Sequence, residues 1–240
     1  MQRACTLEAY AEAKGLPTGF LTRLGLSDFR YAGTPAVRIP YRDPASVEVA
    51  VRFRLALEKG SEGDDRFRWR RGDKAIPYGL WRMDRARQAG YVVLVEGESD
   101  CHTLWHHGVE ALGIPGASNW REEWSDHLDG IEKVYAVVEP DGGGETLKEK
   151  LAGSSIRDRL RFVELGDAKD PSELHLSDPE GFKDSLRAAF GRATRWADEA
   201  RAKTEAQTQD AWAACEEIAR EKRILDRFAA ARCQPIGGSS

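Results

Sequence analysis

The sequence lacks any apolar run that approaches the roughly 20 residues needed to cross a bilayer. Its amino terminus, MQRACTLEAYAEAKG, also lacks the apolar core of a secretory signal peptide. Together these two absences predict a cytoplasmic protein that has no membrane partner.

Cysteine is scarce, and its spacing forms no metal or redox motif. Four cysteines are scattered along 240 residues without a CxxC pair: Cys5, Cys101, Cys215 and Cys233. This spacing indicates neither a disulfide framework nor a zinc ribbon.

The net charge of −4 argues against a uniformly basic surface. The apolar and charged fractions, 41% and 32%, are those of an ordinary folded protein with one large domain or two small ones.

Positive charge is nevertheless concentrated in one region. Between Arg52 and Arg87 there are eleven Lys or Arg residues against six Asp or Glu, and aromatic residues are interleaved with the bases. A basic face with stacking rings suits single-stranded nucleic acid. A solvated β-sheet with alternating arginines would give the same pattern, and composition alone does not decide between the two interpretations.

The region before residue 90 reads as a helical hairpin and a small sheet. Thr6 is expected to cap the first of two short helices in residues 6–26, with the break at 15–17. Alternating apolar and basic residues then predict two or three antiparallel strands with an arginine face, followed by a short helix. The expected strands are 36–41, 47–57 and 66–70, and the expected helix is 83–89.

The strongest structural signal is the apolar run Tyr91–Val95, which is followed by Glu96 and Gly97. A short run without alternation is typical of a strand buried on both faces of a parallel sheet. A helix over 99–107 should follow, with Ser99 as its N-cap. Glu96 would then lie at the carboxyl end of a buried strand, where open α/β sheets bind ligands. Burial of a carboxylate there requires a partner, usually a metal ion.

Strands continue to alternate with helices to about residue 190, which predicts a parallel sheet with right-handed crossovers. The further strands are expected at 109–114, 134–138 and 161–165, and the helices at 120–128, 145–151, 172–176 and 179–190. We therefore expect an α/β fold in which a four-stranded parallel sheet is flanked by helices. A small α+β basic subdomain would precede it and a helical segment would follow it. The expected domains are 1–90, 91–190 and 191–240.

The carboxyl-terminal stretch 193–231 reads as wholly helical and mostly polar, with sparse apolar anchors such as Trp196, Trp212 and Ile218. This segment could pack on the core or lead to a further domain. The tail 234–240 is expected to be disordered.

Three strand ends carry acids: Glu96 with Asp100, Glu139 with Asp141, and Asp167 with Asp170. Because the carboxyl ends of parallel strands lie at one edge, these side chains should converge there. Crowded carboxylates repel one another unless a divalent cation neutralises them. Hard oxygen ligands favour Mg²⁺ or Mn²⁺ over zinc. A single acid after a strand is more often a helix cap, so the recurrence at three strand ends carries the signal.

Four motifs occur in an order that resembles the Toprim domain in its primase form: VEGESD, GIPG, VVEPDGGGE and DAKDPSEL. The similarity extends over about 91–190. The preceding segment Arg38–Trp81 resembles the basic subdomain of bacterial and phage primases. The resemblance implies a metal-dependent phosphoryl-transfer site, with Mg²⁺ or Mn²⁺ as cofactor.

The resemblance also implies roles for individual acids. Glu96 would be the general base or metal-side acid, and Asp100 a supporting catalytic acid. Glu139 and Asp141 would hold the metal and take part in catalysis, and Asp170 would complete the metal site. The sequence departs from the family pattern at three points. Glu139 stands where the family has Asp, Ser172 stands where the family has a second carboxylate, and the zinc ribbon that primases carry ahead of this core is absent.

Basic residues ahead of the apolar run are expected to hold the template strand or the nucleoside triphosphate. They are Arg52, Arg54, Arg66, Arg68, Arg70, Lys74 and Arg82. Lys74 and Arg82, together with Arg85, are weaker candidates for phosphate contacts, and each of these three could equally be an ordinary surface charge. His102 and His106 have the i, i+4 spacing of a zinc half-site, but no HExxH motif is formed. No P-loop lysine follows the glycines at 142–144.

The leading interpretation is the catalytic core of a DNA primase of the kind found on phages, plasmids or other mobile elements. Such a nucleotidyltransferase would synthesise primers on a single-stranded DNA template from nucleoside triphosphates, and the helical end would suit a link to a helicase. One alternative is a Toprim metal-dependent nuclease that uses the same acids. Another is a catalytically weakened nucleic-acid-binding module of a replication protein.

Overall fold

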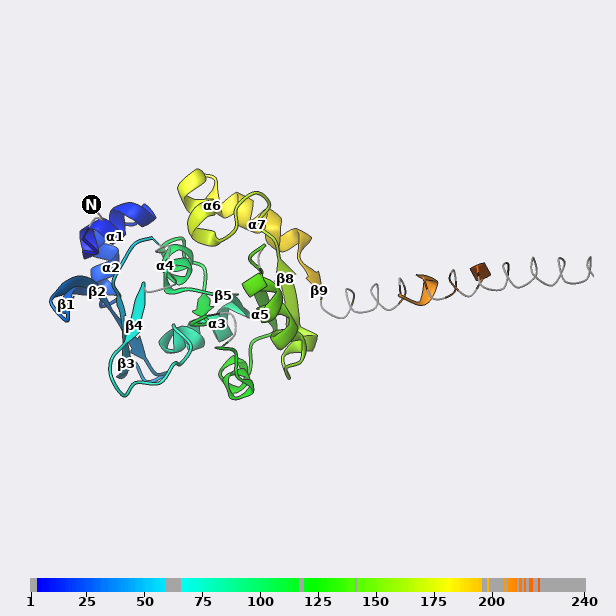
Figure 1. Ribbon diagram of the computed structural model, residues 1–240, viewed down its shortest axis with the longest axis horizontal. Coiled ribbons are helices and arrows are strands. Elements are labelled where there is room, and N and C mark those ends of the chain that lie inside the picture. The colour runs from blue at the N-terminus through cyan, green and yellow to red at the C-terminus, as the bar shows by residue number, and fades with distance from the viewer. Residues whose placement is uncertain are drawn as a thin grey trace, which may run out of the picture. The chain divides into compact units, whose positions relative to one another are not determined.

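The computed structural model describes residues 4–58, 66–116, 119–140 and 142–195, together with separate helical positions between residues 198 and 220. The chain divides into two compact units, Met1–Trp196 and Ala197–Ser240. The first contains the two sheets, and Figure 1 shows their strands and helices. Of the expected anchors in the carboxyl-terminal stretch, Trp212 is exposed. Trp196, Ile218 and the tail 234–240 lie outside the described residues.

The chain opens with the expected helical hairpin, α1 (Leu7–Lys14) and α2 (Thr18–Arg23). The Thr6 hydroxyl accepts a hydrogen bond from Ala9 N, as the capping prediction requires. Helix α1 ends at Gly15, whose φ of +62° lies in the left-handed region that favours glycine. The two helix predictions are therefore confirmed.

The first sheet is antiparallel, with the strand order β1-β2-β3-β4. Its strands are β1 (Ser27–Tyr31), β2 (Thr34–Arg42), β3 (Glu48–Arg54) and β4 (Phe67–Trp69). Strand β1 is not expected from the sequence because SDFRY is polar and lies mostly exposed at the sheet edge. The arginine face expected on this sheet is less exposed than the sequence suggests. Arg54 is only 5% exposed and Arg52 is partly buried, so this face of β3 is covered and is not a solvated surface.

The second sheet has the strand order β6-β5-β7-β8-β9. Its strands are β5 (Tyr91–Val95), β6 (Ala111–Gly113), β7 (Lys133–Val137), β8 (Leu160–Val163) and β9 (Thr194–Arg195). The first four pair in parallel, as predicted, whereas β9 pairs antiparallel with β8. Strand β9 is an addition to the four expected strands, and it begins inside a stretch that the sequence predicts to be wholly helical.

Helices connect and cover these strands close to the expected positions. They are α3 (Met83–Ala89), α4 (Glu98–His106), α5 (Gly142–Ala152), α6 (Pro171–Ser177) and α7 (Phe182–Arg192), with 3₁₀ turns η1 (Leu80–Arg82), η3 (Glu122–Leu128) and η4 (Arg157–Arg159). The assignment of Ser99 as N-cap is wrong. Helix α4 starts one residue earlier, its N-cap is Gly97, and no side chain caps it. The expected helix over 120–128 is a 3₁₀ turn.

Alternate residues of β5 enter two different hydrophobic clusters, so the strand is buried on both faces. Val93 and Val95 pack with Leu104 of α4 and Phe182 of α7. Val92 and Leu94 pack with residues of α3 and α5. The first cluster also includes residues of α1 and β2, so a continuous core joins the first sheet to the second.

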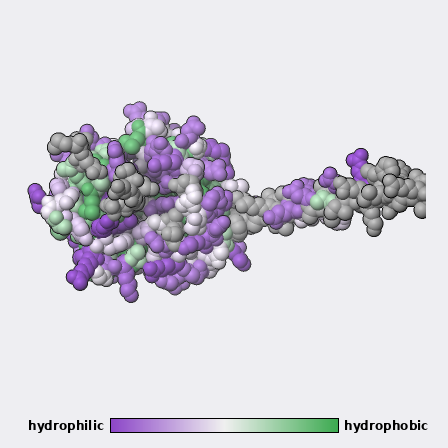
Figure 2. All heavy atoms as spheres, viewed as in Figure 1, coloured by the Kyte–Doolittle hydropathy of each residue, from purple (hydrophilic) through white to green (hydrophobic). Residues whose placement is uncertain are grey.

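In the part of the chain that the structure describes, no helix is both long and apolar enough to cross a bilayer. Figure 2 shows a largely hydrophilic face on the first unit, with scattered apolar patches. The exposed large apolar side chains include Phe29, Val47 and Val49, which belong to the first sheet and its turn.

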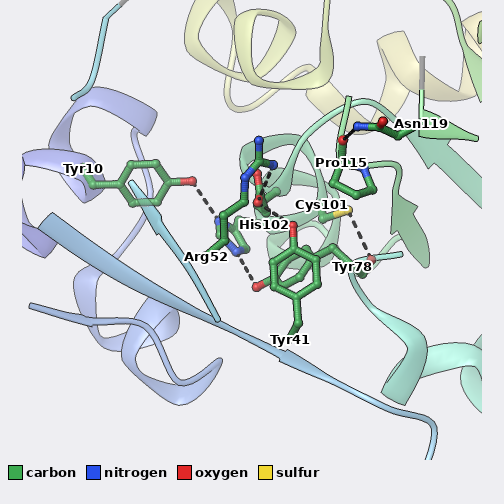
Figure 3. Close-up of polar contacts among 9 residues, drawn as sticks. Tyr10, Tyr41, Arg52, Tyr78, Cys101, His102, Pro115 and Asn119 are labelled. Atoms are coloured by element: carbon green, nitrogen blue, oxygen red, sulfur yellow. Dashed lines mark hydrogen bonds and ion pairs between the residues drawn. The ribbon is translucent and has the colours of Figure 1, made fainter. Parts of the chain in front are cut away.

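A buried histidine fastens α4 to the amino-terminal part of the chain. His102 is fully buried, and its two ring nitrogens lie 2.9 Å from the Tyr10 hydroxyl and 2.8 Å from the Tyr78 hydroxyl (Figure 3). Both nitrogens are therefore engaged by tyrosines, and the idea of a zinc half-site with His106 is wrong. His102 is a structural residue of the core.

Burial lowers the pKa of His102 to about 3, from an ordinary value of 6.5. Below pH 6.5 the unfolded chain therefore takes up a proton that the folded chain does not bind. The free energy of unfolding should be fully maintained above pH 6.5 and should fall as the pH drops toward 3. At pH 5 the loss from this one residue is about 2 kcal/mol.

Urea unfolding at pH 7.5 and pH 5 measures this loss, and the variant His102→Gln is the control. The histidines His106, His107 and His127, whose pKa values are also lowered, remain in the variant. The difference between the two proteins therefore isolates His102. Equal losses of stability in both proteins would show that His102 does not titrate in this way.

Candidate active site

A pocket of about 410 Å³ opens beside the carboxyl ends of the parallel strands. Residues of both sheets contribute to its walls. They are Lys14, Arg52, Arg54, Leu57, Arg66, Phe67, Glu96, Gly97, Glu98, Ser99, Asp100, Gly116, Glu139, Lys169 and Asp170. The pocket thus brings carboxylates that follow strands of the second sheet together with arginines of the amino-terminal part of the chain.

Three of the acids that the sequence analysis selects lie in different loops and meet at this pocket. Glu96 follows β5, Glu139 follows β7, and Asp170 precedes α6, which comes after β8. All three line the pocket, because the parallel strands end at the same edge. Asp167 is not among the lining residues. Asp141 lies outside the described residues.

Asp100 is buried behind this rim at the first turn of α4. Its Oδ1 accepts hydrogen bonds from the Ser172 hydroxyl, at 2.7 Å, and from Ser172 N, at 3.2 Å. The pKa of Asp100 is raised to about 6, chiefly by burial and then by the nearby Asp170 carboxylate, while the hydrogen bonds from Ser172 and the charge of Lys14 act in the opposite direction. The contribution of Asp170 indicates that two carboxylates lie close together here, as in a cation-binding site.

Asp170 also has a structural role. It is the N-cap of α6, and its Oδ1 accepts a hydrogen bond of 2.7 Å from Glu173 N. Its Oδ2 lies 3.5 Å from Lys169 Nζ. Asp170 therefore caps the helix that follows it, as an acid after a strand commonly does, and it also lines the pocket.

Glu98 is the functional candidate that sequence reasoning missed. It is 3% exposed, and its Oε1 accepts hydrogen bonds from the Tyr41 hydroxyl, at 2.5 Å, and from Arg52 Nη1, at 3.0 Å. Burial alone would raise the pKa of Glu98, but Arg52 and the Tyr41 hydroxyl outweigh burial and hold the pKa below its ordinary value. The sequence offered only an extra acid inside VEGESD, since its partners lie more than forty residues upstream.

The basic residues expected to bind nucleic acid or nucleotide divide into two groups. Arg52, Arg54 and Arg66 line the pocket, and the others do not: Arg68, Arg70, Lys74 and Arg82. Arg82 forms a two-bond pair with Glu110, at 2.9 and 3.0 Å, which Arg85 also contacts. Arg70 pairs with Asp73 at 3.0 Å. The structure therefore brings three of the seven candidates to the acids.

The donors in the pocket are hard carboxylate oxygens, which suit Mg²⁺ or Mn²⁺. Within the described ranges, however, no three His, Cys, Asp or Glu side chains are grouped closely enough to hold a metal ion. The fourth expected ligand, Asp141, is not among the described residues. The donor chemistry and the crowded charge around Asp100 therefore fit a divalent cation, and a complete coordination shell would need Asp141 or movement of the acids.

The fold and pocket together define a class of protein: an α/β protein whose parallel sheet presents carboxylates at its edge to a basic antiparallel sheet. No protein-family model and no curated protein sequence matches this chain. Solved structures do match it, and several of them are primase catalytic domains or cores.

The RNA polymerase domain of the Mycobacterium tuberculosis primase DnaG has a TM-score of 0.64 at 13% identity, over 79% of this chain and 76% of that one. The DnaG primase catalytic domain bound to ssDNA has a TM-score of 0.60 at 17% identity, over 79% and 72%. The primase fragment of the bacteriophage T7 primase-helicase has a TM-score of 0.57 at 18% identity, over 74% and 71%. At these identities the likeness is one of fold, and the chain has the fold of a primase catalytic core.

Proposed function

We propose that this protein synthesises primers on single-stranded DNA by nucleotidyl transfer. The observation that carries the proposal is the pocket, which is lined by Glu96, Glu139 and Asp170 from three loops and by Arg52, Arg54 and Arg66 from the first sheet and the turn before β4. Acids opposite arginines suit a phosphoryl-transfer reaction, which depends on positioning and charge stabilisation. The solved structures of the same fold include a primase domain bound to ssDNA, which supports DNA as the template.

The proposed roles of the acids rest on the resemblance to the Toprim motifs, and the place of Glu96, Asp100, Glu139 and Asp170 in the pocket lining supports them. Glu96 accepts the proton of the attacking 3′-hydroxyl or faces the metal, and Asp100 supports it from the first turn of α4. The proposed ligands of Mg²⁺ or Mn²⁺ are Glu96, Glu139, Asp141 and Asp170. When bound, the ion would stabilise negative charge on the transferring phosphate and lower the pKa of the attacking hydroxyl. The pocket arginines would bind phosphate oxygens of the triphosphate or of the template strand.

The strand order β6-β5-β7-β8, with all four strands parallel, supports a Toprim layout for residues 91–190. Residues 1–90 would form the basic subdomain that binds nucleic acid. Residues 191–240 would form a link to a helicase, a proposal that the T7 primase-helicase fragment among the matching structures supports.

Incorporation of labelled NTPs on single-stranded DNA with Mg²⁺ or Mn²⁺ tests the proposal. We expect metal-dependent synthesis by the wild type and loss of it in Asp141→Ala, because that carboxylate is a proposed ligand. The matched control is Asp84→Ala, since Asp84 is an exposed acid of α3 that does not line the pocket. The proposal fails if the wild type incorporates nothing or if Asp141→Ala remains as active as Asp84→Ala.

One observation favours a second candidate, a nucleic-acid-binding module with a weakened metal site. Ser172 stands at a position where the resemblance predicts a carboxylate, and its hydroxyl donates to Asp100. Calorimetric titration with Mn²⁺ separates the two, since an inert site would show no binding. The Toprim nuclease alternative has no observation of its own in its favour, and an assay without NTPs would detect it.

A further inference from the structure

A buried ion pair joins the two sheets at the wall of the pocket. Glu98 begins α4 on the side of the second sheet, and Arg52 belongs to β3 of the first sheet. Arg52 Nη1 lies 3.0 Å from Glu98 Oε1, and the two side chains are 16% and 3% exposed. A buried carboxylate is unfavourable unless it is paired and hydrogen-bonded, which the Tyr41 hydroxyl and Arg52 together achieve.

Aromatic rings pack against the same guanidinium. The Arg52 Cζ atom lies 4.2 Å from the ring centroid of Phe67 and 5.4 Å from that of Trp69, both on β4. Figure 3 shows Arg52 close to Tyr41, and the guanidinium donates through Nη1 to Glu98 Oε1. A guanidinium that is clamped on one nitrogen and packed against rings has little freedom to reorient.

Within the described part of the chain, one N–H group of the Arg52 guanidinium donates no hydrogen bond. Among the described residues, Arg52 Nε is buried and has no hydrogen-bond partner. A buried donor without an acceptor is destabilising by about 1–3 kcal/mol, and such an atom in a pocket points to a ligand that supplies the acceptor. Because Arg52 lines the pocket opposite the acids, the acceptor would be an oxygen of a phosphate group.

We propose that Glu98 is a positioning residue that aims Arg52 at a phosphate of the bound nucleoside triphosphate. Although it lies between Glu96 and Asp100 in VEGESD, Glu98 is not a metal ligand, because its Oε1 accepts from Arg52 and Tyr41 and its side chain is buried. It couples the segment that carries the acids to the sheet that carries the arginines. This inference rests on the proposed function, since that function supplies the triphosphate as ligand.

The variant Glu98→Gln separates two roles of Glu98, because its affinity for ATP should change in opposite directions if Glu98 positions Arg52 and if Glu98 only contributes negative charge. The substitution removes a negative charge from the pocket, so electrostatic attraction alone would make a triphosphate bind more tightly. If Glu98 aims Arg52, replacing its charge-assisted hydrogen bond by the weaker bond to a neutral amide should instead weaken binding of ATP, by about tenfold. Calorimetric titration of the full chain with ATP in the presence of Mn²⁺ measures the dissociation constant without any turnover.

A double-mutant cycle then tests whether Glu98 acts through Arg52. We expect Arg52→Ala to weaken ATP binding at least as much as Glu98→Gln does. In the Arg52→Ala background, Glu98→Gln should weaken binding no further, because nothing remains to be aimed. Arg52→Lys should not restore binding, since an ammonium lacks the planar fork. The matched control is Glu48→Gln, which removes a more exposed carboxylate from the same sheet, where it pairs with Arg38.

The inference is overturned if Glu98→Gln binds ATP as tightly as the wild type or more tightly, or if its effect persists in full without Arg52. If Glu98→Gln does not fold, Tyr41→Phe keeps the ion pair and removes only the second hydrogen bond to Glu98. It should weaken ATP binding in the same direction by a smaller factor, and unchanged binding would contradict the inference. Should the wild type bind ATP but synthesise no primer, the proposed function fails, and the binding cycle still decides the role of Glu98.

Discussion

Glu96→Gln is expected to reduce metal-dependent nucleotide incorporation by about 10²–10⁴-fold, the usual loss when a general acid or base is removed. The substitution keeps the size of the side chain but removes the charge that would accept a proton or face the metal. Glu96 lies at the end of β5 and lines the pocket together with Glu139 and Asp170. Incorporation of labelled NTPs on single-stranded DNA measures the effect.

The matched control is Glu180→Gln, which removes an exposed carboxylate before α7, away from the pocket lining. We expect its activity to equal that of the wild type. Thermal unfolding of both variants verifies that they are folded. If Glu96→Gln keeps an activity comparable to that of Glu180→Gln, Glu96 has no part in the chemistry, and the proposed catalytic role is wrong.

Gly144→Ala is expected to lower the same activity by about 10²-fold, the effect of a displacement of roughly 1 Å in a reacting group. Gly144 lies in the first turn of α5, and a Cβ atom there would overlap the backbone carbonyl, amide nitrogen and carbonyl carbon of Glu139. Backbone atoms cannot rotate away as a side chain can. The loop that carries Glu139 would therefore have to move, and its carboxylate would move out of the pocket wall.

The chain provides a close control in the same glycine run. A Cβ atom at Gly142 would have no neighbour within 4 Å, so Gly142→Ala adds the same methyl group without a clash. We expect Gly142→Ala to retain most of its activity. Similar losses in the two variants would mean that the glycine run acts through its flexibility and not through the close approach to Glu139.

The sequence was sufficient to place the second sheet because the runs at 91–95 and 134–138 are short and apolar, and because the expected strands alternate with helices. Such runs are buried on both faces, and alternation with helices requires them to be parallel. The exceptions have a physical cause. Strand β1 is polar and lies at a sheet edge, and β9 is two residues long, so neither has a pattern that distinguishes it from a loop.

The convergence of Glu96, Glu139 and Asp170 in the pocket also followed from the sequence, because topology alone brings the ends of parallel strands to one edge, whereas Asp167 does not line the pocket. What could not be predicted is which polar groups those acids contact. Glu98 is partnered by Tyr41 and Arg52 of the other sheet, and Asp100 by Ser172 of α6. These contacts depend on how the two sheets and α6 pack, which no local pattern encodes.

The contact between Ser172 and Asp100 is one that depends on this packing. From the sequence it is only a serine at a position where the resemblance predicts a carboxylate. In the structure it donates two hydrogen bonds to Asp100, and these oppose the rise in the pKa of Asp100. A neutral donor at this position thus stabilises the ionised form of a buried carboxylate, where a second carboxylate would repel it.

The proposed chemistry requires that acids from separate strand ends hold one hard divalent cation. A crystal soaked in Mn²⁺, with anomalous scattering recorded at the manganese edge, is the decisive experiment. We expect a manganese peak in the pocket, coordinated by oxygens of Glu96 and Glu139, with Asp141 and Asp170 completing the shell. A pocket without a manganese peak at saturating Mn²⁺, or a peak bound by none of these four carboxylates, would contradict it.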